Sequence, residues 1–401
     1  MLSGTDIIST AMVAALVSFI ACLLILLTQR WHGSLSLDSD TKGVQKFHTR
    51  PVPRIGGVAI LFGTFASALY LSFGSANAAQ SAQSSTVMWL LLAGLPAFVA
   101  GLVEDMTKKV SIHGRLIATF ASALLACWLL GAILLRVDVW GIDALFRWAP
   151  FIAITFTVFA VGGVANAVNI IDGFNGIAGS TVIILLAGLG FLAWRTEDML
   201  VLQLALAGAG ASLGFLLVNY PAGRLFLGDG GAYLAGFWIA EVAILLIARN
   251  PDVNAWQALA VCSYPVIEAM YSIYRKKIVR KSSPALPDRL HMHMLVYRRL
   301  VWKLVPRNAP QPWMRNASVA SVLAVWIAVS TAAAVLLGDT TSAAVAIVIA
   351  QVVAYIAFYT RLVRGTWRIR SFRSMRAAPQ MRRAVKMHSK LQPDVPVRES
   401  A

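Results

Sequence analysis

Asn166–Gly179, which reads N-A-V-N-I-I-D-G-F-N-G-I-A-G, places one Asp and three Asn between two apolar runs that are each long enough to cross a membrane. Such polar groups are costly to desolvate in lipid, so they should face protein, water or a cation. Asn169 and Asp172 lie three residues apart and share one face if the preceding helix continues that far. The glycines that follow allow a tight turn and close approach of a ligand. We therefore expect the mouth of a functional site here.

The composition defines the fold class. The chain has 401 residues, of which 58% are hydrophobic and only 13% are charged, and its mean hydropathy is +0.70. These values are far too apolar for an ordinary soluble protein. We predict an all-α polytopic membrane protein. Eleven transmembrane helices are expected, at about 7–28, 55–74, 86–103, 116–135, 150–171, 176–194, 199–218, 230–248, 255–274, 317–337 and 341–360.

The basic residues predict the orientation. Alternate connections on one side hold 31 of the 35 Lys and Arg, whereas the other side holds only Arg136, Arg147, Arg195 and Arg249. Basic connections stay cytoplasmic, so the N-terminus should lie outside and the C-terminus in the cytoplasm. The formal charge of +17 is then a topology signal that also attracts anionic membrane lipids, and nucleic acid is not expected as a partner.

This topology divides the chain into two parts. Residues 1–360 should form a transmembrane catalytic domain, and residues 361–401 a basic cytoplasmic tail without sustained apolar periodicity, which we expect to be disordered. The cytoplasmic loops that would carry the active site are about 29–54, 104–115, 170–177, 219–230 and 275–315.

Four acidic residues follow or precede spans at the same membrane level. They are Glu104, Asp105, Asp172 and Asp229. Carboxylates that converge at one face repel one another, and a divalent cation stabilises them at neutral pH. Ligands that offer only oxygen favour Mg²⁺ or Mn²⁺ over Zn²⁺. Each acid has a plainer interpretation, as a solvated helix end or a helix cap.

Basic side chains on the same side could bind phosphate. Arg and Lys suit phosphate oxygens, and His can donate to them at physiological pH. The alternative is that they are ordinary surface or juxtamembrane residues. The candidates are Lys46, His48, Arg275, Lys277, Arg289, His291 and His293.

Five motifs in order resemble one known family, the polyisoprenyl-phosphate N-acetylhexosamine-1-phosphate transferases (WecA/MraY-like, glycosyltransferase family 4). They are K-F-H-T-R-P-V-P-R-I-G-G, G-L-V-E-D, N-A-V-N-I-I-D-G-F-N-G-I-A-G, F-L-G-D-G-G and P-D-R-L-H-M-H, over roughly residues 40–300. The form of the last motif is similar to that of the WecA-like branch.

The resemblance implies transfer of N-acetylhexosamine-1-phosphate from a UDP-sugar to undecaprenyl phosphate, with Mg²⁺ as cofactor and UMP as product. It implies a bacterial inner membrane location, a cytoplasmic active site and the first lipid-linked step of cell-surface polysaccharide synthesis, for example of O-antigen in lipopolysaccharide. The expected partners are the UDP-N-acetylhexosamine, undecaprenyl phosphate and anionic lipids. A homodimer is an open alternative to a monomer.

The resemblance also assigns roles. Asp229 and Asn169 match metal ligands, and Asp172 would contact the nucleotide or support the metal. Glu104 and Asp105 match a pair of aspartates, one of which handles the lipid phosphate, and both stay candidates because the first is Glu here. The seven basic candidates and Asn175, where many relatives carry Asp, would bind substrate.

Two other classes of function compete with this reading. Glu241 and Glu268 lie inside expected spans, and buried carboxylates often mark ion or proton paths, so an ion- or proton-coupled transporter is the first alternative. However, the polar motifs cluster at one face and no inverted repeat is evident, unlike in many transporters. A scaffold without activity is the second alternative.

Overall fold

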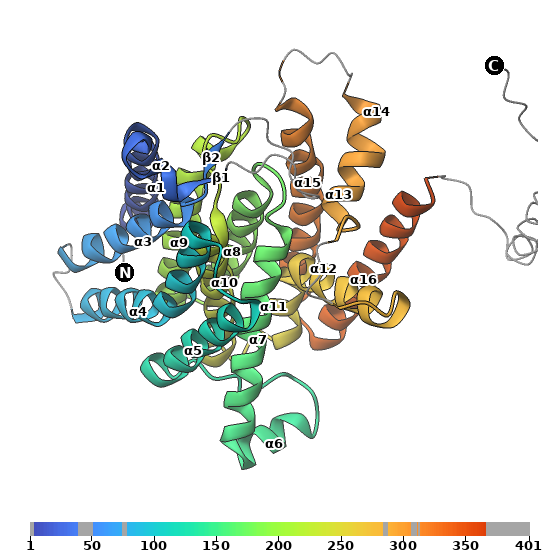
Figure 1. The fold of residues 1–401 in the computed structure, drawn as a ribbon. Coiled ribbons are helices and arrows are strands. Elements are labelled where there is room, and N and C mark those ends of the chain that lie inside the picture. The colour runs from blue at the N-terminus through green and yellow to red at the C-terminus, as the bar shows by residue number, and fades with distance from the viewer. Residues whose placement is uncertain are drawn as a thin grey trace, which may run out of the picture.

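The computed structural model describes residues 4–38, 51–73, 78–283, 288–305, 311 and 313–365, which form a bundle of helices (Figure 1). Within these ranges, ten helices are long and apolar enough to cross a membrane. They are α1 (Gly4–Leu27), α3 (Gly56–Phe73), α4 (Ala78–Thr107), α5 (Ile112–Leu130), α7 (Pro150–Ile171), α8 (Ile177–Arg195), α9 (Met199–Asn219), α10 (Gly228–Arg249), α15 (Met314–Leu337) and α16 (Thr341–Arg364). The prediction of an all-α polytopic membrane protein is confirmed.

The span expected at 255–274 is not one continuous helix, which corrects the predicted number of eleven. It is divided at Cys262 into α11 (Ala255–Val261) and α12 (Ser263–Tyr274). Pro265 lies in the first turn of α12. Proline has no N–H to donate to the carbonyl four residues earlier, and its ring clashes with that carbonyl, so it favours the start of a helix and disfavours a continuous one.

Short elements occupy parts of the expected cytoplasmic loops. Two strands of two residues each, β1 and β2, pair antiparallel, with Leu37 opposite Pro53. The strand pair and α13–α14 lie at one end of the bundle, and α6 lies at the other (Figure 1). These elements are α2 (Gln29–Ser36), β1 (Leu37–Asp38), β2 (Val52–Pro53), α6 (Ile142–Trp148), η1 (Arg275–Val279), α13 (Met292–Val296), η2 (Tyr297–Val301) and α14 (Trp302–Leu304).

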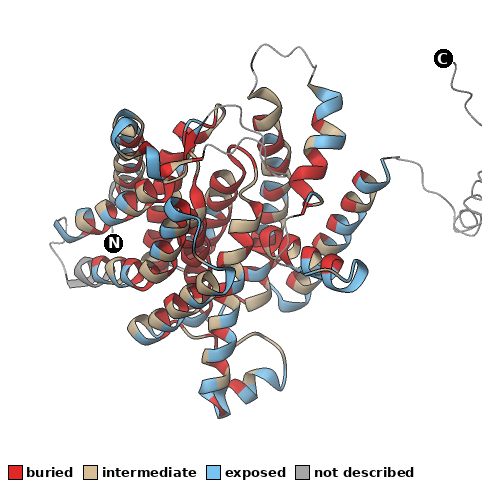
Figure 2. Ribbon diagram, viewed as in Figure 1, coloured by how far each residue is buried: buried red, intermediate tan, exposed pale blue. Residues whose placement is uncertain are grey.

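Helix α10 is the centre of the bundle, since 94% of its spanning segment is buried (Figure 2). Glycines let α3 and α4 approach its first turn. A Cβ added to Gly57 of α3 would lie 2.3 Å from the backbone of Gly231, and one added to Gly101 of α4 would lie 2.5 Å from that of Gly230. Backbone-to-backbone packing of this kind is typical of small residues in membrane helices. It holds the start of α10 rigidly between two neighbours.

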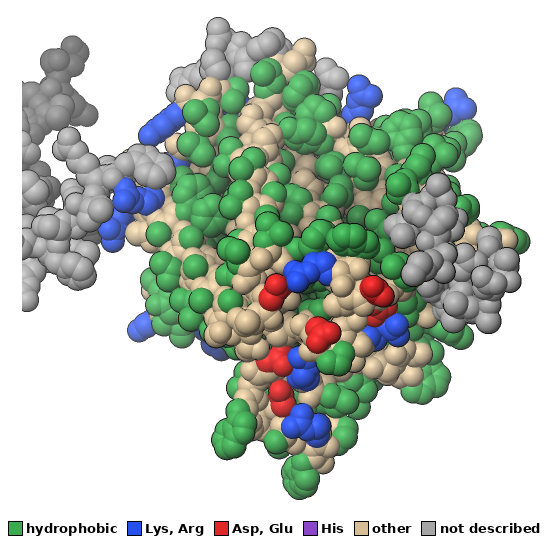
Figure 3. Space-filling view, turned by 180° about the vertical axis from the view of Figure 1, so that it is seen from behind, with side chains coloured by type: hydrophobic (Ala, Val, Ile, Leu, Met, Phe, Trp, Pro, Cys, Tyr) green, Lys and Arg blue, Asp and Glu red, His purple; other side chains and the backbone are tan. Residues whose placement is uncertain are grey.

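The periphery of the bundle is apolar, as expected of a surface in contact with lipid. Figure 3 shows hydrophobic side chains over most of one face, with the acidic side chains gathered in its lower half beside several basic ones. Only 17% of the spanning segment of α16 and 28% of that of α1 are buried. At the connections between helices, ion pairs such as Arg249–Asp198 (2.7 Å) and Arg195–Asp339 (2.9 Å) join helix ends. Most charged side chains thus lie near the ends of the spans, and Glu241 in α10 and Glu268 in α12 are buried exceptions.

Candidate active site

Asp229, in the first turn of α10, is the centre of the site. Its carboxylate accepts a hydrogen bond from Asn169 Nδ2 at 3.1 Å, where α7 ends. It pairs with Arg54 Nη2 at 3.4 Å, just before α3, and with Arg115 in the first turn of α5. Four segments that are far apart in sequence therefore meet at one carboxylate, and Asn169 and Asp229, the two metal ligands that the resemblance implies, are in contact.

Asp105 is buried next to Asp229, with only 2% of its surface exposed. Its two oxygens accept the backbone N–H groups of Asp229 at 2.9 Å and Gly230 at 3.0 Å. These are among the N–H groups that a helix leaves without a partner in its first turn, and an anion is stabilised there. Arg54 Nη2 also lies 3.4 Å from Asp105, so one guanidinium bridges both acids. Asp105 thus fixes the position of Asp229.

Glu104 points elsewhere, although it precedes Asp105 directly. Its Oε2 accepts the backbone N–H of Val110 at 2.8 Å and so holds the turn between α4 and α5. The two acids of the E-D pair therefore have different surroundings. Only Asp105 belongs to the cluster around Asp229.

Asp172 follows the last residue of α7 and keeps part of its surface exposed. Burial raises the pKa of Asp172 to about 7; the charge of Arg54 opposes this rise, and the negative charges of Asp229 and Asp105 add to it. The repulsion shows that the three carboxylates share one electrostatic environment.

The two histidines form a second cluster against the turn that follows Asp172. Their rings stack, with centroids 5.5 Å apart and planes inclined by 10°. A Cβ on Gly173 would lie 2.5 Å from His293 Nε2, so only glycine fits beneath that ring. Burial and, to a smaller extent, the neighbouring His291 lower the pKa of His293 to about 3 against the opposing charge of Glu268, so the ring is neutral at physiological pH. The structure thus places the motif P-D-R-L-H-M-H, which contains both histidines, against the motif N-I-I-D-G, which contains Asp172 and Gly173.

The remaining candidates lie apart from Asp229 or outside the described residues. Arg275 is buried in an ion pair with Asp288 and also donates to Tyr359 Oη and the Leu290 carbonyl, at 2.6 Å each. Asn175 anchors the turn: its N–H donates to Asn316 Oδ1 at 2.8 Å and its side chain to the Pro221 carbonyl at 3.0 Å. Lys277 and Arg289 are exposed, and Lys46 and His48 fall outside the described residues.

Arg54 and Arg115 are the residues of the cluster that the sequence did not identify as site residues. Arg54 stands in R-P-V-P-R-I-G-G, so its nearness to a motif was a usable signal. Arg115 ends the stretch K-K-V-S-I-H-G-R, ten residues after Asp105. Nothing in that stretch distinguishes it from the other basic residues that set the membrane orientation. Only the packing of α5 beside α10 reveals its partner.

The residues fit a bound divalent cation only in part. In the described segments, no three His, Cys, Asp or Glu side chains are grouped so that they could hold a metal ion. The oxygen donors at the site are Asp229, Asp172 and the amide of Asn169, whose oxygen and nitrogen can exchange places by a flip. Mg²⁺ commonly takes one or two carboxylates and completes its shell with water and phosphate oxygens. The donor chemistry therefore suits Mg²⁺ bound together with a phosphate-bearing substrate.

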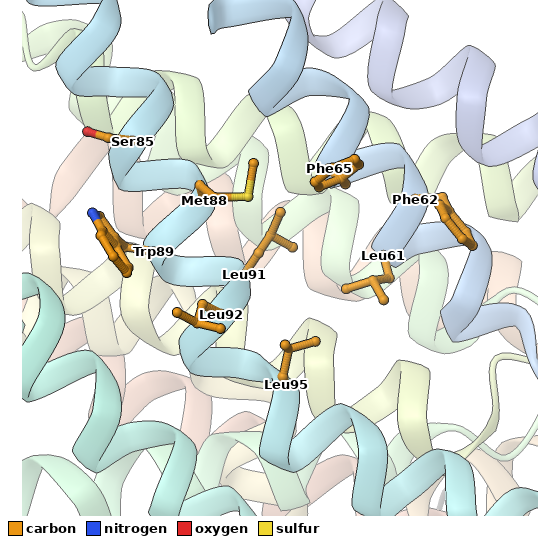
Figure 4. A pocket seen from close by; sticks show the side chains of 9 residues that line it. All are labelled: Leu61, Phe62, Phe65, Ser85, Met88, Trp89, Leu91, Leu92 and Leu95. Carbon is orange, nitrogen blue, oxygen red and sulfur yellow. The ribbon is translucent and has the colours of Figure 1, made fainter.

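An apolar groove runs between α3 and α4 (Figure 4). Its volume is about 490 Å³, and Ser85 is the only polar residue in its lining. Both walls lead toward the charged cluster, because Arg54 lies two residues before α3 and Asp105 lies near the end of α4. The lining residues are Leu61, Phe62, Phe65, Ser85, Met88, Trp89, Leu91, Leu92 and Leu95.

Fold and site together define a class: polytopic membrane proteins with a cluster of acids and arginines where spans end. A sequence profile of glycosyl transferase family 4 matches residues 87–247, which include Asp105, Asp172 and Asp229. Over these residues the chain is similar to the members of this family.

Three relatives illustrate the similarity. The probable undecaprenyl-phosphate N-acetylglucosaminyl 1-phosphate transferase of Bacillus subtilis is 25% identical over 257 residues, which are 63% of this chain and 68% of the relative. The undecaprenyl-phosphate alpha-N-acetylglucosaminyl 1-phosphate transferase of Thermotoga maritima is 27% identical over 66% of this chain and 75% of its own. The phospho-N-acetylmuramoyl-pentapeptide-transferase of Halalkalibacterium halodurans is 27% identical over 63% of this chain and 78% of its own. These relatives do not support the transporter alternative.

Proposed function

We propose that this protein transfers N-acetylhexosamine-1-phosphate from a UDP-sugar to undecaprenyl phosphate. The observation that carries the proposal is the convergence of Asp229, Asn169, Arg54 and Arg115 from four segments of the chain. The relatives are named for this reaction. A charged site at the ends of spans suits a lipid phosphate, because the phosphate of such a lipid lies at the interface and its tail in the bilayer.

The chemistry is phosphoryl transfer between two anions. A lipid phosphate oxygen forms a bond to the β-phosphorus of the UDP-sugar, the bond from that phosphorus to the bridging oxygen breaks, and UMP leaves with the oxygen. Catalysis then consists mainly of positioning and charge neutralisation. A phosphate monoester, with a second pKa of about 6, is already largely dianionic at neutral pH. A separate deprotonation step is therefore not required.

Each residue of the cluster has a defined part in this proposal. Arg54 and Arg115 bind phosphate oxygens, as guanidinium groups do. Asp105 holds the first turn of α10 and the guanidinium of Arg54 in place. Asp229 and Asn169 would hold Mg²⁺ beside Asp172, which requires Arg115 to exchange its carboxylate partner for a phosphate. When bound, Mg²⁺ supplies positive charge that offsets the charge of the diphosphate.

The groove between α3 and α4 is our candidate for the isoprenoid tail. Leu95 precedes Asp105 on α4 by about 15 Å of helix axis, at 1.5 Å per residue. A lipid with its phosphate at the charged cluster could therefore extend its tail along the helix and reach the groove beyond its first isoprene units.

Purified protein tests the proposal directly. We expect UMP release from UDP-N-acetylglucosamine and undecaprenyl phosphate in Mg²⁺, no release in excess EDTA, and recovery on addition of Mg²⁺ or Mn²⁺. Asp229→Asn, which should lower turnover at least about 100-fold, is the inactive control. A donor panel that includes UDP-N-acetylmuramoyl-pentapeptide would identify the sugar. Substrate flux without UMP release would instead indicate transport, and undiminished turnover in EDTA would exclude the metal.

The location and pathway follow from the same reasoning. We propose a bacterial inner membrane with the charged cluster on the cytoplasmic side, where nucleotide sugars are made, and a lipid-linked step of surface polysaccharide synthesis. The distribution of Lys and Arg supports this side.

A further inference from the structure

Glu268, in α12, is fully buried, and both of its carboxylate oxygens are used. Oε1 lies 2.9 Å from His291 Nδ1. Oε2 accepts the hydroxyl of Tyr355 at 2.7 Å, and the backbone N–H of Met292 donates to both oxygens, at 3.3 and 3.1 Å. One carboxylate thus binds a histidine ring, the first N–H of α13 and a side chain of α16.

This contact defines the state of the His291 ring. An ionised carboxylate can only accept hydrogen bonds, so Nδ1 carries a proton and Nε2 is the nitrogen left for a ligand. The ring cannot easily rotate, because it also stacks on His293, and His293 in turn packs on Gly173 beside Asp172. Contacts therefore run without a break from Glu268 to the turn that carries Asp172.

We propose that Glu268 is a positioning residue for the transferase: it fixes the tautomer and orientation of His291, so that Nε2 meets the diphosphate of the nucleotide sugar. The inference rests on the proposed function and adds a residue from an element outside the family match. A carboxylate behind a histidine, which orients it for a ligand on the other nitrogen, is a common arrangement, and loss of such a carboxylate typically costs about 10- to 100-fold in activity.

A purely structural role for Glu268 makes different predictions. The same network joins α12, α13 and α16, so its loss could simply loosen the bundle. In that case activity and stability would fall together, and the effect of changing Glu268 would not depend on the residue at position 291. A positioning role requires such dependence.

A double-mutant cycle separates the two roles. The variants are Glu268→Gln, His291→Ala and the combination, with kcat and KM for UDP-N-acetylglucosamine measured for each. Glu268→Gln alone should lower kcat about 10- to 100-fold. In the His291→Ala background it should change kcat by less than about twofold, because the residue it acts through is gone. Effects that multiply in the double variant would overturn the proposal.

Glu241→Gln is the matched control. Glu241 is also a fully buried glutamate in a membrane helix, but neither of its oxygens has a hydrogen-bond partner among the described residues. The same substitution there replaces a buried glutamate by glutamine without touching a histidine. We expect wild-type kcat in this variant. A fall equal to that of Glu268→Gln would show that burial of a glutamate, and not the contact with His291, is what matters.

A spectroscopic measurement does not depend on activity. In ¹⁵N spectra of histidine-labelled protein in lipid, the signal absent from His291→Gln identifies this ring. Wild-type protein should show a protonated Nδ1 hydrogen-bonded to a carboxylate, and Glu268→Gln should shift that signal. An unchanged signal refutes the positioning role even if UMP is released. A shifted signal in a protein that releases no UMP supports the positioning role and refutes the proposed reaction.

Discussion

At the scale of single residues, adjacent acids have separate roles because helix geometry points them in different directions. Asp105 faces α10 and accepts two of its N–H groups, whereas Glu104 turns toward the α4–α5 connection and accepts one from Val110. Successive residues of a helix lie on different faces. The pair therefore should not be treated as two equivalent candidates for one catalytic role.

We predict that Asp105→Asn is much more harmful than Glu104→Gln. Asparagine has one acceptor oxygen, so a buried N–H of α10 loses its partner, at a cost of about 1–3 kcal/mol. If this cost is added to the activation free energy of the reaction, turnover falls roughly 10-fold or more. Glutamine at 104 still accepts from Val110, so turnover should stay within about threefold. UMP release and the thermal unfolding midpoint of each variant check this. The reverse order would assign the catalytic acid to Glu104.

The residues that the sequence left unassigned show where residue-level reasoning ends. Asp229 and Asn169 lie in motifs with unusual polarity for their surroundings, and the family resemblance named both as metal ligands before their contact was seen. Arg115 is an ordinary basic residue until α5 packs beside α10. Arg275 looked like a phosphate ligand, but Asp288 and Tyr359 occupy its guanidinium. Sequence identifies which residues are charged, and packing decides which charges pair.

At the scale of elements, the function depends on how helix ends are held together. Apolar runs located the spans, because desolvation alone decides which segments can cross lipid. The division of 255–274 was not predicted, although Pro265 was visible, since proline is also tolerated within membrane helices when neighbours satisfy the freed carbonyl. The short α13 was likewise hidden in a basic loop. Its first N–H is capped by Glu268 from another helix.

The groove between α3 and α4 supports a prediction about lipid length. Leu92→Trp should fill part of the groove and raise KM for undecaprenyl phosphate about tenfold, while KM for a two- or three-isoprene phosphate stays the same. One tenfold step corresponds to about 1.4 kcal/mol, or roughly two buried CH₂ groups. Leu124→Trp, at an exposed position on α5 that is not part of the groove lining, is the control. Equal KM changes for both lipids would place the tail elsewhere.

At the scale of the whole molecule, the uneven distribution of Lys and Arg and the position of the charged cluster indicate the same side of the membrane. All residues around Asp229 lie on segments that the Lys and Arg distribution assigns to the cytoplasm. Ion pairs such as Arg249–Asp198 lie on segments assigned to the outside. The fold is thus a thick apolar layer between two charged ends, only one of which contains several acids that repel one another.

Cysteine labelling checks the orientation. The three native cysteines are buried, so an impermeant maleimide should react only with introduced ones. Lys281→Cys, at an exposed position after η1, should react in inside-out vesicles, and Asp252→Cys, between α10 and α11, in right-side-out vesicles. Both variants should retain turnover, because neither residue contacts the site. The opposite labelling pattern would invert the topology and place the site away from cytoplasmic nucleotide sugars.

The sequence by itself determined the class of protein, the position of nearly every span and the level at which the acids lie, because burial of apolar surface and desolvation of charge are local properties of a segment. Only the tertiary structure decided that Asp105 supports α10 while Glu104 holds a turn, that Arg54 and Arg115 neutralise Asp229, and that Glu268 stands behind His291. Apart from the contact of Glu104 with Val110, these pairings join residues more than twenty positions apart, so they exist only where packing brings distant segments together.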